Sequence, residues 1–194
     1  MRCRSFSRLP LGLLSCAAAF AVAAPAHAGL LVSSAPSCST ETLSQPFLPW
    51  LDPASYTPVP GGTFETGQPA WSLSGAAAVT AGNESAYLHG PSDSASLSLP
   101  DGSSATSPSM CVGIQNPTLR FMARNGGSLF STLRVDVLFE DALGVVHAAP
   151  IASVGGGSSW LPTLPLPIAV NLLPLLPGQE TAIAFRFTPQ GAGG

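Results

Sequence analysis

The chain has 194 residues, only 9% of them charged, and its seven basic and ten acidic side chains give a formal net charge of −3. It contains no lysine. Proteins that bind DNA or RNA neutralise runs of phosphates with basic side chains, so this composition excludes nucleic-acid binding. The same shortage of basic residues argues against a polybasic patch for an anionic membrane surface.

The first 28 residues have the features of a cleavable secretory signal. Three arginines and no acid precede an apolar run from Leu9 to Ala24, and Ala26 and Ala28 form a small-x-small cleavage site. The apolar run has about 16 residues, fewer than the roughly 20 that a membrane-spanning helix needs. The sequence therefore predicts a secreted or periplasmic protein without a retained membrane anchor.

Cleavage after Ala28 would change both the charge and the cysteine content. Four arginines and all ten acids remain, so the formal charge becomes −6, and the remaining cysteines are Cys38 and Cys111. An even pair of cysteines in an oxidising compartment usually forms a disulfide. This one would close a loop of about 73 residues, which the chain-entropy model values at about 4 kcal/mol. The CxxC spacing of a redox site is absent, so we expect a structural disulfide.

Residues 29–62 are predicted to form an extended lead-in, rich in Pro and Ser, before a single β-sandwich domain at residues 63–194. Five prolines between residues 46 and 60 disfavour both a regular helix and a central strand. The segment also contains Phe47, Trp50 and Tyr56. It is therefore too apolar for a solvated tail, and we expect it to wrap the domain.

From Thr63 onward, apolar and polar residues alternate with the period of two that is typical of strands. The clearest predicted strands are 118–124, 132–140 and 182–188. Weaker ones are 70–73, 77–80, 94–99, 110–114, 145–149 and 168–172. Turns are expected at Asp101-Gly102, Asn125-Gly126 and Leu143-Gly144. The apolar segment 161–177, with five prolines, indicates a loop or an edge strand. Short, evenly spaced strands without a helical stretch predict an all-β fold, an antiparallel two-sheet sandwich.

Several segments of the chain are similar to carbohydrate-binding-module-like jelly rolls of secreted bacterial proteins. The similarity lies in Gly62-Thr63-Phe64-Glu65-Thr66-Gly67 followed by Trp71, in SASLSLP, and in TLRFMARN, LRVDVLF and AIAFRFTP. The run SSATSPSMCVG also resembles a group of secreted proteins. This resemblance implies a jelly-roll sandwich that binds carbohydrate.

Many such jelly rolls continue into a closing strand of the form WxIDDVxV, which does not occur in this sequence. The resemblance therefore implies that the sequence is truncated or that the sandwich is one strand short. A missing strand would leave main-chain groups unpaired and open to strand addition. An assembly protein that pairs through an open sheet edge is therefore the alternative function.

The four arginines outside the signal all fall in the three clearest strands, opposite the apolar residues. If these strands share a sheet, one face carries all of the positive charge. Cross-strand ion pairing on a solvated face would explain this pattern structurally. Recognition of a hydroxyl- or carboxylate-rich ligand by guanidinium groups would explain it functionally. We take Arg120, Arg124 and Arg134 as candidate ligand-binding residues.

Sugar recognition also uses exposed aromatic rings, which offer an apolar face. Trp160, which follows the Gly/Ser segment 155–159, and Tyr87 are the first candidates, whereas Trp71 is expected in the core. Together with the arginines, they predict a secreted, non-catalytic binding module for a glycan or another cell-surface polymer.

Motifs for catalysis and for zinc are absent from the sequence. No GxSxG nucleophile motif occurs, and two cysteines with His89 and His147 do not have zinc-ligand spacing. We expect His89 in a loop and His147 at a solvent-facing strand position. No cofactor is predicted. A structural calcium would need several oxygen ligands, and the candidates are Glu65, Glu84, Asp93 and Asp101. A hydrolase is the least supported alternative.

Overall fold

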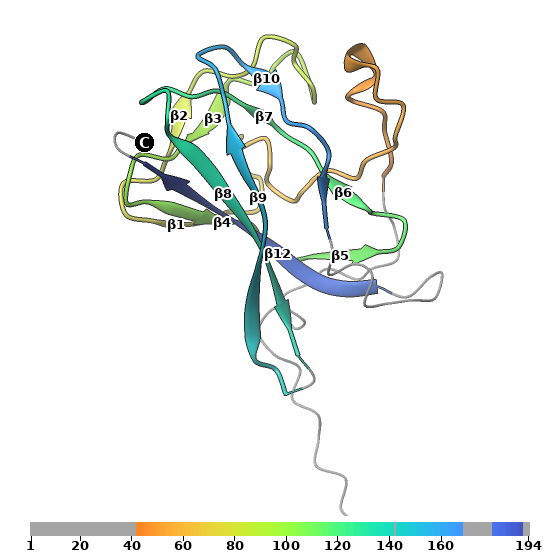
Figure 1. The fold of residues 1–194 in the computed structure, drawn as a ribbon. Helices are drawn as coiled ribbons and strands as arrows, with labels where there is room; N and C mark the ends of the chain where they lie inside the picture. The colour runs from red at the N-terminus through yellow and green to blue at the C-terminus, as the bar shows by residue number, and fades with distance from the viewer. Residues whose placement is uncertain (1–41, 142, 169–179, 192–194) are drawn as a thin grey trace, which may run out of the picture.

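The computed structural model describes residues 42–141, 143–168 and 180–191, and its dominant element is one six-stranded antiparallel sheet (Figure 1). The strand order is β1-β4-β12-β8-β9, and β5 also pairs with β12. The strands of this sheet are β1 (Ser72–Ser74), β4 (Ser104–Thr106), β5 (Met110–Gly113), β8 (Thr132–Glu140), β9 (Val146–Gly155) and β12 (Glu180–Gln190).

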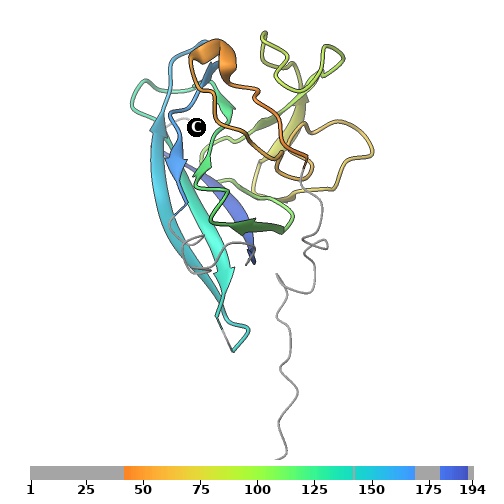
Figure 2. The same ribbon diagram turned by 90° about the vertical axis from the view of Figure 1, so that its right-hand side faces the viewer.

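Three two-stranded antiparallel sheets lie over one face of the six-stranded sheet (Figures 1 and 2). They pair β2 (Ala78–Ala81) with β3 (Ala95–Ser98), β6 (Thr118–Leu119) with β11 (Leu166–Pro167), and β7 (Met122–Ala123) with β10 (Leu161–Pro162). The described residues contain one short 3-10 helix, η1 (Leu48–Trp50), and none of their helices is long and apolar enough to cross a membrane. The prediction of an antiparallel all-β fold is confirmed.

The hydrophobic core lies between the six-stranded sheet and the shorter sheets. Alternation along β8 and β12 directs Val135, Val137, Ile183, Phe185 and Phe187 to this side, and all five are buried. A fully buried aliphatic or aromatic side chain of this size contributes about 1.5 to 3 kcal/mol. The other buried members of the cluster are Met110, Val112, Leu119, Leu166 and Ile168.

Ser107 joins β4 to β5, both of which pair with β12. Its amide donates to the Phe185 carbonyl at 2.9 Å, and its buried hydroxyl accepts a hydrogen bond from the Phe185 amide at 2.9 Å. The same hydroxyl donates to the Pro108 carbonyl at 2.9 Å. The hydroxyl therefore takes the place of a main-chain acceptor where the chain passes from one strand to the next.

Two of the three clearest strand predictions are confirmed. β8 matches residues 132–140, and β12 contains 182–188 and extends beyond both ends. The third is wrong as a single strand of the same sheet, because residues 118–124 form β6 and β7, which pair with β11 and β10 instead. Both short strands meet proline-containing partners, and proline lacks the amide that a longer ladder needs.

The weaker strand predictions correspond to β1, β2, β3, β5 and β9, with shifted ends. Leu143-Gly144 does lie in the turn between β8 and β9, where Gly144 has a φ of 76°. Asn125-Gly126 is not a hairpin turn, because β7 does not pair with β8. Ile168 lies outside any strand, and residues 169–172 lie outside the described part of the chain. The structure adds β4, which the pattern did not predict, and it places β10 and β11 in the segment 161–177, for which the sequence left a loop or an edge strand open.

The described part of the lead-in packs on the domain. Ser44 and Tyr56 form a main-chain bridge, and Phe47 is buried with an exposed fraction of 2%. Its ring meets the Tyr56 ring edge-to-face with centroids 5.1 Å apart. The lead-in thus contributes an aromatic anchor to the packing of the domain.

Candidate functional site

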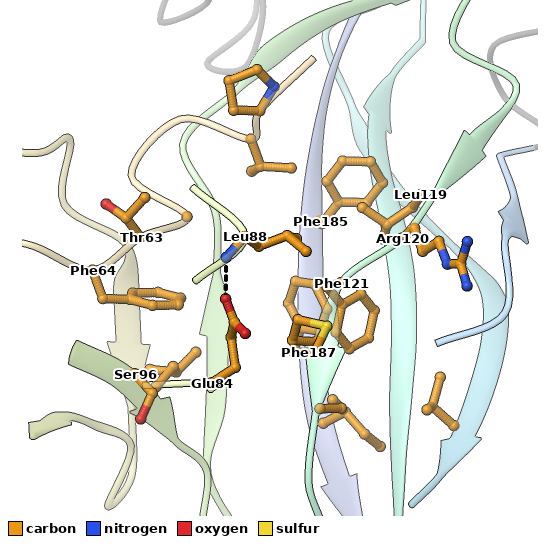
Figure 3. A pocket seen from close by; sticks show the side chains of 18 of the residues that line it. Thr63, Phe64, Glu84, Leu88, Ser96, Leu119, Arg120, Phe121, Phe185 and Phe187 are labelled. Atoms are coloured by element: carbon orange, nitrogen blue, oxygen red, sulfur yellow. Dashed lines mark hydrogen bonds between the residues drawn. The ribbon is translucent and has the colours of Figure 1, made fainter. Parts of the chain in front are cut away.

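A cavity of about 950 Å³ lies between β12 and the β2–β3 hairpin, and it is bounded also by β6, β7 and the lead-in. Phe185 and Phe187 of β12 line one wall, with Phe121 beside them, and Phe64 lies across from them (Figure 3). Phe121 meets Phe187 edge-to-face at 5.2 Å between centroids. The volume lies in the range of ligand-binding pockets, about 300 to 1,000 Å³.

Trp71 closes the aromatic wall from the side of the shorter sheets. Its ring centroid lies 5.5 Å from that of Phe187 and 5.1 Å from that of Phe64. Its indole N–H donates to the Pro60 carbonyl at 3.1 Å. Trp71 is partly buried and packs on the core, as the sequence predicted.

Two polar side chains reach into this apolar surrounding. The Glu84 carboxylate is 5% exposed and accepts hydrogen bonds from the Ala86 amide at 2.6 Å and from the Leu88 amide. In Figure 3 it lies between the rings of Phe64 and Phe187. Thr63 also lines the cavity, and its buried Oγ1 has no hydrogen-bond partner among the described residues.

Arg120 does not lie on an exposed sheet face, so that expectation is wrong. Its side chain is 7% exposed, and its guanidinium donates to Asp52 and, at 2.7 Å, to the Thr163 carbonyl. It also stacks over the Phe47 ring at 4.7 Å. Arg120 lies between β6 and β7 and outside both strands, and these contacts tie it to the lead-in.

The carboxylate of this ion pair is held in its charged form. The hydrogen bond from the Tyr56 hydroxyl at 2.7 Å, with those from the Ala54 amide and Arg120, lowers the pKa of Asp52 below its ordinary value. Burial, together with the hydrogen bond to Asp52, raises the pKa of Tyr56. Tyr56 therefore remains a hydrogen-bond donor to Asp52 at neutral pH.

Arg134 and Arg186 do share a sheet face, and both are ion-paired there. Arg134 donates to Asp136 Oδ1 at 2.8 Å, and Arg186 donates to Asp136 Oδ2 at 3.2 Å. Asp136 is 1% exposed, and the strands that carry the three residues, β8 and β12, are neighbours. Ion pairing with Asp136, within β8 for Arg134 and between β12 and β8 for Arg186, therefore accounts for these two arginines.

Arg124 differs from the other three arginines, since it has no carboxylate partner within the described segments. Its side chain is exposed, and its guanidinium carbon lies 5.2 Å from the ring centroid of the half-buried Trp160. The Asn125 amide donates to the Gly157 carbonyl at 2.7 Å, which holds the two loops together. The structure thus joins two residues that the sequence analysis selected separately.

Tyr87 lies in the connection between β2 and β3 and is 50% exposed. It adopts a left-handed φ of 51°, which is uncommon for a residue with a side chain. It does not line the cavity, whereas Arg124 and Trp160 both do. Tyr87 is therefore a separate candidate from the Arg124–Trp160 pair.

The calcium candidates are not brought together. Within the described residues, no three His, Cys, Asp or Glu side chains form a group that could hold a metal ion. Hydrogen bonds from the Ser94 and Ala95 amides, at 2.6 and 2.8 Å, lower the pKa of Glu65. Asp93 contacts His89 at 3.0 Å, and Asp101 accepts from the Gly102 amide at 3.0 Å.

The second histidine, His147, lies on β9 and is exposed, as predicted. Its Nε2 contacts Asp141 Oδ2 at 2.8 Å, and its ring stacks on Phe139 at 5.5 Å. This hydrogen bond, with those from the Val145 and Leu143 amides, lowers the pKa of Asp141. The contacts stabilise the end of the β8–β9 hairpin.

Cys111 is buried in β5, and Cys38 lies outside the described residues, as does the whole predicted signal at 1–28. The Cys38–Cys111 disulfide therefore stays a prediction. Comparison with protein-family models, with curated proteins and with solved structures finds no match for this chain. The resemblance to carbohydrate-binding-module-like jelly rolls likewise stays a prediction.

Proposed function

We propose that the protein is a secreted, non-catalytic binding module of jelly-roll type that recognises a glycan or another hydroxyl-rich cell-surface polymer. The observation that carries the proposal is the exposed Arg124 guanidinium stacked on Trp160 at 5.2 Å without a carboxylate partner among the described residues. A guanidinium that is not engaged by a carboxylate keeps its N–H donors for a ligand.

The two side chains supply complementary parts of sugar recognition. The indole of Trp160 offers an apolar plane for the ring of a sugar, and Arg124 supplies fixed donors for hydroxyl or carboxylate oxygens. Stacking on the indole limits the rotamers of Arg124, which reduces the entropy lost on binding. The neighbouring Gly155, Gly156 and Gly157 have no side chains to obstruct an approaching polymer.

A glycan array followed by polysaccharide pull-down tests this proposal. We expect Trp160→Ala and Arg124→Ala each to weaken binding about tenfold, equivalent to about 1.4 kcal/mol. Arg134→Ala is the matched control, because it removes the same charge from an arginine already paired with Asp136. Binding should stay within twofold of the wild type in this control.

Three outcomes would contradict the proposal. The first is the absence of binding to any glycan or wall polymer. The second is binding that survives both substitutions but is lost in Tyr87→Ala, which would move the ligand to the β2–β3 connection. The third is turnover in a broad hydrolase screen, which would contradict a non-catalytic role.

A further inference from the structure

The loop between β7 and β8 presents two adjacent apolar side chains to solvent. It covers residues 124–131, and the exposed fractions of Leu129 and Phe130 within it are 87% and 91%. A single exposed apolar residue is common on protein surfaces. Here two large neighbouring side chains are left almost wholly uncovered by the described part of the chain. We call this pair, Leu129 and Phe130, the apolar tip.

The apolar tip occupies the two central positions of a β-turn. The Ser131 amide donates to the Ser128 carbonyl at 2.9 Å, which closes the turn, and the Phe130 amide donates to the Ser128 hydroxyl at 3.3 Å. Asn125 stabilises the loop, because its side-chain amide donates to the Ser128 carbonyl at 2.7 Å and its Oδ1 accepts from the Gly127 amide at 2.9 Å. The turn therefore holds the apolar tip in a defined position.

This internal hydrogen bonding suits an apolar environment. Main-chain groups that enter a lipid layer lose their water partners, and a group left unsatisfied there is costly. The amides of Gly127, Phe130 and Ser131 already have acceptors within the loop. Residues 125–133 also contain no charged side chain. The turn can thus enter an apolar layer without burying a charge or leaving these three amides unpaired.

The loop begins beside residue types that favour the boundary between lipid and water. Thr132 of β8 pairs with Gly155 of β9, so the loops before β8 and after β9 lie at the same end of the large sheet (Figure 1). Arg124 and Trp160, one from each loop, stack at 5.2 Å. Tryptophan is enriched at membrane interfaces, and an arginine stem can lie on apolar groups while its charged head stays in water.

The small area of the apolar tip favours a lipid surface over a protein partner. A stable protein interface covers about 800 Å² on each partner, whereas one large buried aromatic side chain accounts for only about 150 to 250 Å². Leu129 and Phe130 together therefore fall well short of an interface between two proteins. A lipid layer needs no complementary shape, and its binding strength follows the apolar area that enters it.

The net charge of the chain indicates the class of lipid. The formal charge is −3 for the whole sequence and remains negative after the predicted cleavage, so an anionic bilayer would repel the protein. We propose that the apolar tip inserts into the surface of a membrane of zwitterionic lipids, with Arg124 and Trp160 at the level of the headgroups. This gives the protein a point of attachment that requires no glycan.

Sedimentation of the purified protein with phosphatidylcholine vesicles tests this proposal. We expect weak binding at about 1 to 10 mM lipid, since two side chains bury less apolar area than a myristoyl chain does. Phe130→Ser should weaken binding about tenfold, equivalent to about 1.4 kcal/mol. Because insertion does not depend on charge, about 1 M NaCl should not reduce binding, and phosphatidylglycerol vesicles should bind less protein at low salt.

Leu143→Ser is the matched control. Leu143 is 86% exposed in the turn between β8 and β9, at the opposite end of the sheet, and its amide donates to the Asp141 carboxylate at 2.8 Å. A charged group beside this turn opposes its entry into lipid. Vesicle binding by Leu143→Ser should therefore stay within twofold of the wild type.

Four outcomes would overturn the proposal: no sedimentation at about 10 mM lipid, equal binding by wild type and Phe130→Ser, an equal loss in Leu143→Ser, or stronger binding to phosphatidylglycerol. Light scattering that shows a dimer converted to a monomer by Phe130→Ser would mean that a second copy covers the apolar tip. A Tm lowered by more than about 5 °C in Phe130→Ser would mean that the chain itself covers it. The vesicles contain no sugar, so each of these outcomes leaves the proposed glycan binding untouched.

Discussion

Arg120 and Asp52 are 68 positions apart in the sequence and form an ion pair between β6 and the lead-in. The exposed fractions of their side chains are 7% and 14%. If one partner is removed, little water can therefore reach the charge of the other. Phe47, Tyr56 and the Thr163 carbonyl complete the same cluster. The pair therefore determines whether the proline-rich lead-in stays on the domain.

Replacing Arg120 should loosen this contact. We expect Arg120→Ala to lower the Tm by about 5 to 10 °C and Arg120→Lys to restore little of the loss, since one ammonium group cannot reach Asp52 and Thr163 as a guanidinium fork does. Differential scanning calorimetry measures both. Arg124→Ala, at an exposed side chain without a carboxylate partner among the described residues, is the control. Equal Tm values for the Arg120 and Arg124 variants would refute the structural role of Arg120.

The Ser107 hydroxyl should make a measurable contribution to the free energy of unfolding. Ser107→Ala leaves the buried Phe185 amide without its acceptor, and an unsatisfied buried amide costs about 1 to 3 kcal/mol. Urea unfolding should show this loss as a lower midpoint at an unchanged slope. Ser104→Ala, on the neighbouring β4 and half-buried, should change the free energy of unfolding by less than about 0.5 kcal/mol. A Ser107→Ala protein as stable as this control would contradict the prediction.

The fold should lose stability in acid. Hydrogen bonds from Tyr56, from the Ser94 amide and from His147 lower the pKa values of Asp52, Glu65 and Asp141, respectively, below their ordinary 3.8, 4.5 and 3.8. A carboxyl whose pKa is lowered by folding stabilises the fold above its unfolded-state pKa, and this contribution is lost as the pH falls through the folded-state pKa. These three groups should leave the urea concentration at the unfolding midpoint unchanged between about pH 7 and pH 5. At pH values under about 4, that midpoint should decrease.

Two substitutions test whether these carboxyl groups, and not other titratable groups, cause the loss of stability in acid. Asp52→Asn with Glu65→Gln should lower the midpoint at neutral pH and flatten its decline in acid, because neither amide titrates. A decline with the same steepness in this double variant would assign acid lability to other groups.

The Cys38–Cys111 pair should be oxidised in protein exported from the cell. Peptide mapping with and without reduction should recover the two cysteines in one linked fragment. Loss of a native disulfide from a small secreted domain costs about 2 to 5 kcal/mol, so reduction should lower the Tm. Recovery of both cysteines as free thiols, alkylated without reduction, would refute the disulfide.

The strands that could be predicted from the sequence are the long ones, because their alternation of apolar and polar residues can be recognised without knowing the neighbouring strand. β8 alternates over nine residues with Val135 and Val137 fully buried, and a period of two is sufficient to identify it. β10 and β11 have two residues each and include Pro162 and Pro167. Their strand character comes from pairing with β7 and β6, which no local pattern encodes.

The candidate site was only half predictable for the same reason. Alternation placed Arg120, Arg124, Arg134 and Arg186 opposite apolar residues, but it could not distinguish the three that meet Asp52 or Asp136 from the one that meets Trp160. Arg124 and Trp160 come from segments joined by β10 pairing and by the Asn125–Gly157 hydrogen bond. A partner 36 residues away leaves no signal in local periodicity, and the cavity itself exists only between sheets.

The irregularity in β9 affects how one edge of the six-stranded sheet can pair with another strand. β9 forms one edge of the six-stranded sheet, and its register shifts beside Asp136, where Pro150 lacks an amide. A strand that approaches this edge meets an interrupted ladder, because the proline offers no donor and the shifted register displaces the neighbouring main-chain groups. The β9 edge is therefore protected against pairing with the sheet of a second copy.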